Sequence, residues 1–416
     1  MKNHEIRDIG LAPSGRRKID WVSGNMPLLR GLEDEYGGEK PFRGVKVSLS
    51  IHLEAKTARL CEALAACGAE MSVTGSNALS TQDDVAAALA ERGMKVYAFH
   101  RASSEEYGRH IEMALEHAPN IIIDDGGDLV GMVHGRRPDL ARDVWGGCEE
   151  TTTGIIRLKA MEREGALRFP MVAVNDARCK HLFDNRYGTG QSVWDSIMHN
   201  TNLIIASKTA VVAGYGWCSR GIAMRAAALG ASVIVTEIDP VKAIEARMDG
   251  FAVMPMAKAA ALGDIFVTAT GCKRTIGAEH MLLMKDGAIL CNAGHFDVEV
   301  DMEALEGLAA EKKAERDNIR GYRLRDGRWL HVLAEGRLVN IAASNGHPAE
   351  IMDMSFAVQF LSALYILRNR GRLENRVVDV SAEIDGLVAS RRLAAWGTEI
   401  DRLTEEQERY LNSWNL

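Results

Sequence analysis

The sequence predicts an α/β protein with two domains, each a Rossmann-like, doubly wound parallel sheet. Strand-like and helix-like segments alternate over 45–125, and the alternation returns over 209–292, where a glycine-rich turn joins a strand to a helix. Strands that alternate with helices pair in parallel, because each helix returns the chain to the start of the next strand. The two regions share this architecture but not their sequence, which favours two domains over an internal repeat.

The first region begins with a strand and a helix. Residues 45–51 alternate apolar and polar side chains, as a strand does, and 54–67 carry apolar residues at helical spacing. Ser80 is the expected N-cap of the second helix, with Asp83 in its first turn. The other elements expected here are strands at 71–73, 95–99 and 121–123, and helices at 80–92 and 104–118.

The second region repeats the alternation of strands and helices, and a hairpin and a charged helical segment are expected after it. Residues 323–333 hold Asp326-Gly327 between extended flanks, which predicts a hairpin. Residues 386–416 are charged and helical, and we expect them to form an arm or a packed terminal helix. The other expected elements are strands at 209–214, 232–237, 264–268 and 288–292, and helices at 219–229 and 241–248.

The composition excludes several classes of protein. The 416 residues carry a formal net charge of −7, which argues against a nucleic-acid partner, because such a partner favours a basic face. No apolar run is long enough to cross a membrane, and 1–10 lack the apolar core of a signal peptide, so we expect a cytoplasmic protein. The seven cysteines form no CxxC pair, so we expect buried, reduced thiols and no metal site.

A glycine-rich turn follows the strand expected at 209–214. Gly214 allows a tight turn, and Gly216 lets a pyrophosphate approach the N–H groups at the start of the next helix. Glu237 lies 23 residues past Gly214, where a carboxylate binds both ribose hydroxyls and repels the 2′-phosphate of NADP. Ser219 stands where the fingerprint has its third glycine. The turn predicts an NAD site, and a strand–helix turn without a ligand is the alternative.

A series of short motifs runs from about residue 45 to residue 350. They are Ser80-Thr-Gln-Asp83, Asp124-Asp-Gly-Gly-Asp128, Glu149-Glu-Thr-Thr-Thr-Gly154, Phe183-Asp-Asn185, Gly214-Tyr-Gly216, Val235-Thr-Glu-Ile-Asp-Pro240, Gly294-His-Phe-Asp297, Glu335-Gly-Arg-Leu-Val-Asn340 and Gly346-His-Pro348. In these motifs and in their order the chain resembles the adenosylhomocysteinase (S-adenosyl-L-homocysteine hydrolase) family.

The resemblance implies a central NAD domain inserted into a substrate domain that is split in sequence. We therefore expect a first substrate-binding part over 1–185 and an NAD-binding Rossmann domain over 186–345. The second substrate-binding part is expected over 346–385, followed by a C-terminal helical arm over 386–416. The resemblance also implies one tightly bound NAD per subunit and a homotetramer.

The reaction implied by the resemblance is reversible hydrolysis of the thioether of an S-nucleosyl-L-homocysteine, within S-adenosylmethionine recycling. Bound NAD oxidises the 3′-hydroxyl, which makes the 4′ hydrogen removable by a modest base and allows the sulfur at C5′ to leave. The electrons return to the substrate at the end, so no NADH is released. A simple NAD-dependent alcohol dehydrogenase, which would release NADH, is a remote alternative.

Matching positions imply roles for individual residues. Lys180, with its pKa lowered by burial, and Asp184 act at the 3′-hydroxyl, while Asp125 and His52 transfer protons at C4′ and at the sulfur or water. Glu150 holds the ribose hydroxyls. A solvated lysine at 180 and structural histidines at 52, 295 and 347 are the alternatives. The remaining implied site residues are His295 and His347 in the substrate cleft and, for NAD, Thr151, Thr152, Thr153, Asn185, Gly214, Gly216, Glu237 and Asn340.

Two residues depart from the family pattern near the purine. The family reads His-x-Thr-x-Glu or Gln, whereas this chain reads His52-Leu-Glu54-Ala-Lys56. Lysine only donates hydrogen bonds, which suits O6 of hypoxanthine, and Glu54 can accept from N1–H. The pattern resembles the subgroup that hydrolyses S-inosyl-L-homocysteine. Two alternatives stay open: a surface ion pair that touches no base, and adenine bound through N6 by Glu54 and through N1 by Lys56.

The C-terminus is a second departure. Many family members end in a Lys/Tyr-containing tail that reaches into a neighbour's NAD site. Residues 405–416 show no such tail, which weakens the expectation of a cross-subunit NAD contact here.

Overall fold

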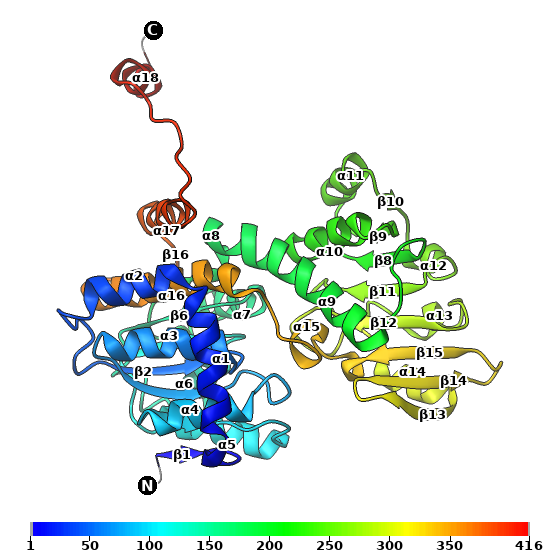
Figure 1. Cartoon of the computed structure of the whole chain (residues 1–416), viewed down its shortest axis with the longest axis horizontal. Coiled ribbons are helices and arrows are strands. Elements are labelled where there is room, and N and C mark those ends of the chain that lie inside the picture. The colour runs from blue at the N-terminus through cyan, green and yellow to red at the C-terminus, as the bar shows by residue number, and fades with distance from the viewer. Residues whose placement is uncertain (1–2, 415–416) are drawn as a thin grey trace.

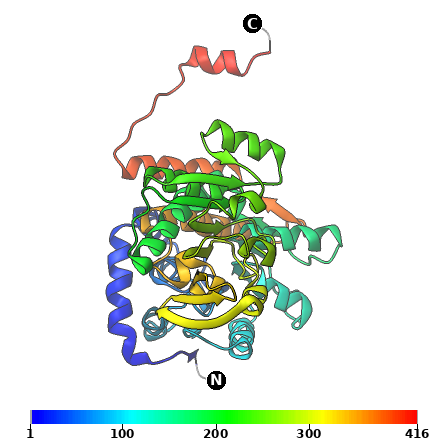
Figure 2. The same cartoon turned by 90° about the vertical axis from the view of Figure 1, so that its right-hand side faces the viewer.

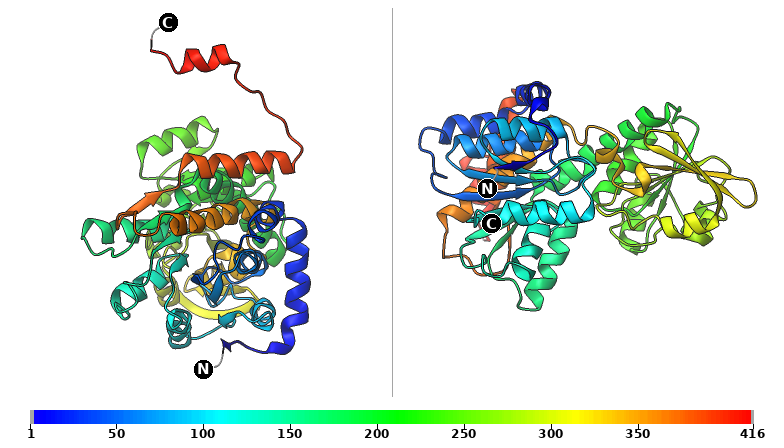
Figure 3. Two further views of the ribbon diagram at one scale, coloured as in Figure 1. Left: turned by 90° about the vertical axis from the view of Figure 1, so that its left-hand side faces the viewer. Right: turned by 90° about the horizontal axis from the view of Figure 1, so that it is seen from below.

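Two lobes, each built around an eight-stranded sheet, lie side by side in the computed structural model, which describes residues 3–414 (Figures 1 and 3). The first lobe holds the N-terminal elements and the second holds the elements from α9 to α15. The two-sheet α/β fold predicted from the strand–helix alternation is confirmed.

The first sheet is entirely parallel, in the order β1-β4-β3-β2-β5-β6-β7-β16. Its two edge strands come from opposite ends of the chain. The strands are β1 (His4–Glu5), β2 (Lys46–Ser50), β3 (Glu70–Thr74), β4 (Lys95–Tyr97), β5 (Ile121–Asp124), β6 (Gly146–Glu149), β7 (Met171–Ala173) and β16 (Val377–Asp379).

Both faces of the first sheet are buried, as a doubly wound sheet requires. Successive side chains of a strand point to opposite faces. On β5, Ile121 and Ile123 enter one apolar core and Ile122 enters another. The helical segments of this part are η1 (Ile9–Leu11), α1 (Ala12–Gly24), α2 (Pro27–Tyr36), α3 (Ala55–Ala66), α4 (Asp83–Glu91), α5 (Ser104–Leu115), α6 (Asp128–Gly135), α7 (Thr152–Arg163), η2 (Val174–Asp176), α8 (Arg178–Lys180) and η3 (His181–Gly188). The next helix, α9 (Thr189–Thr201), packs in the core of the second lobe.

The second sheet runs in the order β10-β9-β8-β11-β12-β15-β14-β13. From β10 to β15 in this order, neighbouring strands are parallel. Strand β14 is antiparallel to both β15 and β13, and its pairing with β15 confirms the hairpin predicted at Asp326-Gly327. The strands are β8 (Thr209–Ala213), β9 (Ser232–Thr236), β10 (Ala252–Val253), β11 (Ile265–Thr268), β12 (Ala288–Asn292), β13 (Ala309–Arg316), β14 (Ile319–Leu324) and β15 (Trp329–Leu333).

Helices cover both faces of the second sheet as well, since Val212 of β8 enters one core and Val211 enters another. The helix after the glycine turn begins two residues earlier than expected, at Trp217. The helical segments are α10 (Trp217–Ala228), α11 (Pro240–Met248), α12 (Met256–Ala259), α13 (Ala278–Met281), α14 (Met302–Leu308), η4 (Ala334–Gly336) and α15 (Val339–Ala342).

After α15 the chain returns to the first lobe. The long helix α16 (Ala349–Arg368) packs in its core, and β16 adds to the sheet beside β7. The second lobe is therefore inserted into the first, while the residue boundaries of the four expected parts stay predictions. Among the described residues, α16 is the one helix long and apolar enough to cross a membrane, and 78% of its apolar window is buried inside the fold.

The C-terminal segment leaves the body of the molecule. Helix α17 (Ala382–Ala395) packs against the first lobe through Val388 and Arg392, and α18 (Glu405–Leu411) lies at the far end of an extended stretch (Figure 2). All seven cysteines are free; five are buried as expected, whereas Cys218 is half-buried and Cys272 is exposed.

Candidate active site

Acidic residues meet at the carboxyl ends of two neighbouring strands in the first sheet. β5 and β6 pair with Asp124 opposite Glu149, so the next residues, Asp125 and Glu150, leave the sheet at the same edge. In parallel sheets, ligands bind at this edge. Asp125 and Glu150 are both buried.

A π-helical segment, η3, brings the predicted Lys180, Asp184 and Asn185 together. Lys180 Nζ donates to Asn185 Oδ1 at 2.8 Å and lies 3.4 Å from carboxylate oxygens of both Asp184 and Glu150. The wide turn of a π-helix brings residues five apart onto one face, which explains the Lys180–Asn185 contact. All four side chains are buried, so the alternative of a solvated lysine is wrong.

The expected lowering of the Lys180 pKa is also wrong. Burial lowers the pKa of the ammonium group, but the carboxylates of Asp184 and Glu150 outweigh burial, and the net shift is upward. Lys180 is therefore a charged ammonium group in the protein without substrate.

Helix α16 and the loop before it hold the two carboxylates. Ser355 Oγ donates to Asp184 Oδ2 at 2.7 Å, and His347 Nδ1 lies 2.9 Å from Asp184 Oδ1. Gln359 Nε2 donates to Glu150 Oε2 at 2.5 Å. Burial raises the pKa of Asp184, but Lys180, His347 and these hydrogen bonds hold it well below its usual range. Burial raises the pKa of Glu150 to about 7, with Asp184 adding to the rise against Lys180.

A second cluster joins the two lobes. Asp125 Oδ2 lies 3.6 Å from His52 Nε2, and Asp125 Oδ1 lies 3.9 Å from His295 Nδ1, which comes from the second lobe. Burial lowers the pKa of His52, so it is a neutral imidazole that can accept a proton. Ser80 is not the N-cap of α4: the cap is Gln82, and Ser80 Oγ lies 2.7 Å from His52 Nδ1.

The same three side chains are the one group of potential metal ligands found among residues 3–414, with ligand atoms within 4.8 Å of one another. The expectation of no metal site stays a prediction.

Glu54 and Lys56 form a buried pair rather than a surface one. Glu54 caps α3, and Lys56 Nζ lies 2.8 Å from Glu54 Oε2. Lys56 Nζ also donates to the carbonyl oxygen of Asn345 at 2.8 Å, on the chain that returns from the second lobe. The pair therefore lies where the two lobes meet, and Lys56 is beside Gly346, the residue before His347.

The glycine turn of the second lobe fits a dinucleotide. Gly214 has a φ of +89°, which glycine adopts without strain, and a Cβ at Gly216 would point into open space at the start of α10. No side chain caps this helix, so its first N–H groups remain available to a phosphate. Ser219 is fully buried, and its Oγ donates to the Ala269 carbonyl, which explains how serine serves at the third glycine position.

The other residues predicted for NAD lie on both lobes. Glu237 accepts hydrogen bonds from Tyr215 N and Ile238 N at the end of β9, next to the turn. Asn340 is buried, with Oδ1 free of hydrogen bonds. Thr151 caps α7 on the first lobe, followed by Thr152 and Thr153 in its first turn.

Sequence reasoning missed Ser355, Gln359 and Glu149 as parts of the site. Glu149 Oε1 accepts from Gly126 N and Thr151 N, and it fixes the two turns that carry the site. Its place in the motif at 149–154 was the available signal. Ser355 and Gln359 gave no signal, because only the fold brings α16 into contact with Asp184 and Glu150.

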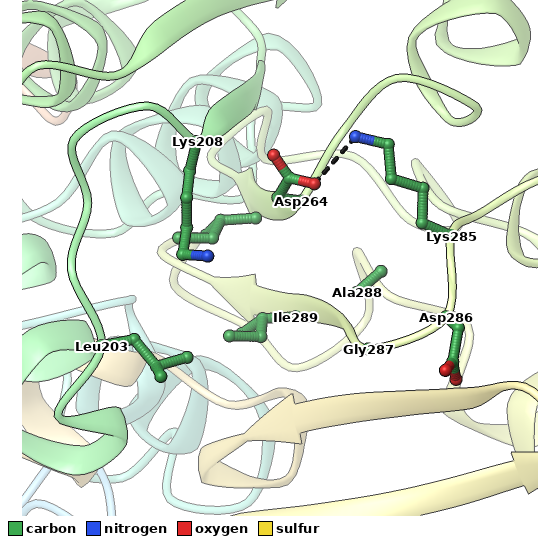
Figure 4. A pocket seen from close by; sticks show the side chains of 9 residues that line it. Leu203, Lys208, Asp264, Lys285, Asp286, Gly287, Ala288 and Ile289 are labelled. Atoms are coloured by element: carbon green, nitrogen blue, oxygen red, sulfur yellow. Dashed lines mark hydrogen bonds and ion pairs between the residues drawn. The ribbon is translucent and has the colours of Figure 1, made fainter.

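A hollow of about 140 Å³, seen in Figure 4, lies away from this chemistry. It is at the amino ends of β11 and β12, where Lys285 pairs with Asp264 at 2.8 Å, opposite the strand ends that carry the glycine turn. We therefore do not assign it to the active site.

Comparison with known proteins identifies the family. Residues 185–346 match the family described as "S-adenosyl-L-homocysteine hydrolase, NAD binding domain", and residues 3–140 match "S-adenosyl-L-homocysteine hydrolase". The adenosylhomocysteinase of Thermococcus kodakarensis is 58% identical over 99% of this chain and 98% of its own length. The S-inosyl-L-homocysteine hydrolase of Methanocaldococcus jannaschii is 56% identical over 99% of both chains. The chain therefore belongs to the adenosylhomocysteinase family of thioether hydrolases with an NAD-binding domain.

Proposed function

We propose that this NAD-dependent S-nucleosyl-homocysteine hydrolase acts preferentially on S-inosyl-L-homocysteine. The products are inosine and L-homocysteine, the reaction is reversible, and its role is in S-adenosylmethionine recycling. The observation that carries the choice of purine is the buried Glu54–Lys56 pair at the junction of the lobes.

The donors of Lys56 explain the preference. An ammonium group has three N–H donors and no acceptor. Two of them are directed at Glu54 Oε2 and the Asn345 carbonyl oxygen, which leaves one for a ligand. That donor matches O6 of hypoxanthine, whereas the amino group of adenine would meet it donor to donor.

S-adenosyl-L-homocysteine is the second candidate substrate. Glu54 could accept from the adenine N6 amino group while Lys56 donates to N1, which acts as an acceptor in adenine. A relative that is 58% identical bears the name adenosylhomocysteinase, which supports this alternative.

The Lys180 cluster is suited to chemistry at the 3′-hydroxyl. NAD, when bound, supplies the reversible oxidation of this hydroxyl. Glu150 orients the ribose, Asn185 contacts NAD, and Lys180 moves the proton at the 3′ oxygen. Asp184 holds Lys180 in place, since it is its permanent counter-ion.

Asp125 and His52 act on the other side of the ribose. Once C3′ is oxidised, the 4′ hydrogen lies α to a carbonyl, and Asp125 can remove it. His52, neutral and held by Ser80, exchanges a proton with the departing sulfur or the entering water. His295 closes over this pair from the second lobe.

The test supplies each thioether separately to the purified protein and measures free thiol. We expect S-inosyl-L-homocysteine to be hydrolysed at least about 100-fold more efficiently than the adenosyl compound, as sites built for one hydrogen-bonding group reject its analogue. Equal efficiency on both would overturn the purine preference. Steady release of NADH without thiol would instead indicate a dehydrogenase.

A second measurement tests the cofactor. Acid-denatured protein should release NAD at near one equivalent per chain, because Glu237 lies where it would repel the 2′-phosphate of NADP. Recovery of NADP, or of no nicotinamide cofactor after reconstitution, would contradict the assignment.

A further inference from the structure

We propose that two side chains on one face of helix α16 give the carboxylates of Asp184 and Glu150, which flank Lys180, different roles in the reaction. Ser355 and Gln359 are positioning residues: Ser355 keeps Asp184 as a fixed anion, and Gln359 orients Glu150 as the acceptor of the Lys180 proton. The proposal rests on the function proposed above and names residues that act on that reaction through their carboxylate partners.

The two residues act from a single helix face. Ser355 and Gln359 are four positions apart, so their side chains lie one turn from each other on the same side of α16. Both are fully buried. Each makes one hydrogen bond toward the site, Ser355 Oγ to Asp184 Oδ2 at 2.7 Å and Gln359 Nε2 to Glu150 Oε2 at 2.5 Å.

The resulting environments of the carboxylates are unequal. Asp184 has both oxygens occupied, Oδ2 by Ser355 and Oδ1 by His347 Nδ1 at 2.9 Å. Glu150 has only Oε2 occupied. Its Oε1 is buried without a hydrogen bond and lies 3.4 Å from Lys180 Nζ.

This difference decides where the Lys180 proton goes. Lys180 is an ammonium group, so it must lose a proton before it can accept the one from the 3′-hydroxyl. An N–H bond of Lys180 breaks, an O–H bond forms on Glu150 Oε1, and the neutral amine then takes the 3′ proton. Of the two carboxylates Glu150 is the stronger base, because burial raises its pKa to about 7 while the pKa of Asp184 is held far below its usual range, so Glu150 is the better acceptor of this proton.

Few charged groups face Glu150. They are Lys180 from α8, Asp184 from η3 and Asp125 from the end of β5, with the Cys148 thiol on its own strand. The contact from α16 is the neutral amide of Gln359. A change at Gln359 therefore alters the ionisation of Glu150 without removing a charge.

The experiment compares Gln359→Met and Ser355→Ala with a matched control, Ser362→Ala. Ser362 is a fully buried serine on the same helix, and its hydroxyl makes no hydrogen bond. The NAD-loaded enzyme is mixed with S-inosyl-L-homocysteine, and the rate at which bound NAD is reduced is followed by absorbance between about pH 6 and pH 9.

The two variants should behave differently. Losing the Gln359 donor destabilises the ionised form of Glu150 and so raises its pKa. The acid limb of the rate profile should therefore move up by about one pH unit, which is the shift expected when one hydrogen bond to a charged group is lost. Ser355→Ala should lower the rate about tenfold or more without moving the limb, because Asp184 stays ionised throughout. Ser355→Thr should restore the rate, and Ser362→Ala should match the parent.

An infrared measurement separates this proposal from the proposed function. The carboxylic acid C=O band of Glu150, identified by its loss in Glu150→Gln, should titrate at higher pH in Gln359→Met even without substrate. If the parent reduces no NAD with either thioether, the proposed function fails, while this band still reports on Gln359. A band and a rate profile that both superimpose on the parent would overturn the proposal, and Gln359→Asn offers the same test if the methionine variant does not fold.

Discussion

Lys180 has two carboxylates within 3.4 Å and almost no contact with water. We expect Lys180→Ala to lower the rate of reduction of bound NAD by about 10²- to 10⁴-fold, the usual contribution of a positioned acid/base group. NAD content after purification should stay at the parent level, because the glycine turn is on the other lobe. Stopped-flow absorbance after mixing with substrate measures the rate.

The control for this change is Lys312→Ala, which removes an exposed lysine paired with Glu306 on the second lobe. If Lys180→Ala reduces NAD as fast as this control, Lys180 is not the acid/base group.

The Glu54–Lys56 pair makes a different prediction. Glu54→Thr with Lys56→Glu should shift the ratio of kcat/KM toward the adenosyl substrate, because an acceptor then faces N6. Lys56→Glu alone should do worse than the double variant, since two neighbouring buried carboxylates would repel each other. Ratios of kcat/KM for both thioethers in the three proteins provide the measurement, and unchanged ratios would show that the pair does not contact the base.

Single residues show what sequence patterns can and cannot predict. Asp125 and Glu150 were identifiable because they belong to the motifs at 124–128 and 149–154, whereas the strand β6 that positions Glu150 was not predicted. Ser80 was misassigned because a serine before a helix fits an N-cap locally, and only the fold brings His52 within 2.7 Å of it. The direction of the Lys180 pKa shift failed for a similar reason: burial was foreseen, but not the combined effect of two adjacent carboxylates.

At the scale of elements, two helices cross at a pair of glycines. A Cβ on Gly221 of α10 would lie 1.7 Å from the Arg186 carbonyl oxygen of η3, and one on Gly190 of α9 would lie 2.5 Å from the Gly221 carbonyl oxygen. The helix that carries the phosphate-binding turn therefore touches the segment that carries Asp184 and Asn185.

We expect Gly221→Ala to destabilise the protein by roughly 1–3 kcal/mol or more, because no atom of this backbone contact can move aside freely. The rate of NAD reduction should fall as well, since η3 must shift. The matched control is Gly307→Ala on α14, where a Cβ meets open space and alanine favours the helix. Thermal unfolding and stopped-flow absorbance measure both effects; equal unfolding temperatures in the two variants would contradict the prediction.

Elements with a clear period were predictable and others were not. β13 reads Ala-Ala-Glu-Lys-Lys-Ala-Glu-Arg, a composition that favours a helix, yet it pairs with β14 at the sheet edge, where exposed charges are common. The π-helical η3 has no sequence signature, because its wide turn is stabilised by the contacts of Lys180, Asp184 and Asn185.

At the scale of the whole molecule, the arm exposes apolar side chains. Tyr410, Leu411 and Trp414 are 61%, 66% and 95% exposed. We expect a homotetramer in which another subunit covers the arm, because exposed apolar groups of this size favour burial.

Size-exclusion chromatography with light scattering tests this expectation. The parent should elute as a tetramer, and a chain truncated after Gly397 should form smaller assemblies. Trp21→Ser, which changes a 76% exposed tryptophan on α1, serves as the control. A tetramer that survives the truncation would show that the arm is not part of the interface.

The insertion of the second lobe into the first also decides which core is completed first during synthesis. The helix α16 supplies Phe356 and Phe360 to the first core, where Phe360 meets Phe42 edge-on at 5.6 Å, and β16 completes the first sheet. A ribosome reaches them only after the roughly 160 residues of the inserted lobe, which takes about 8–32 s at typical elongation rates. During this interval the first lobe lacks its central helix and keeps an apolar face open. The first lobe to be translated is therefore the last to complete its core.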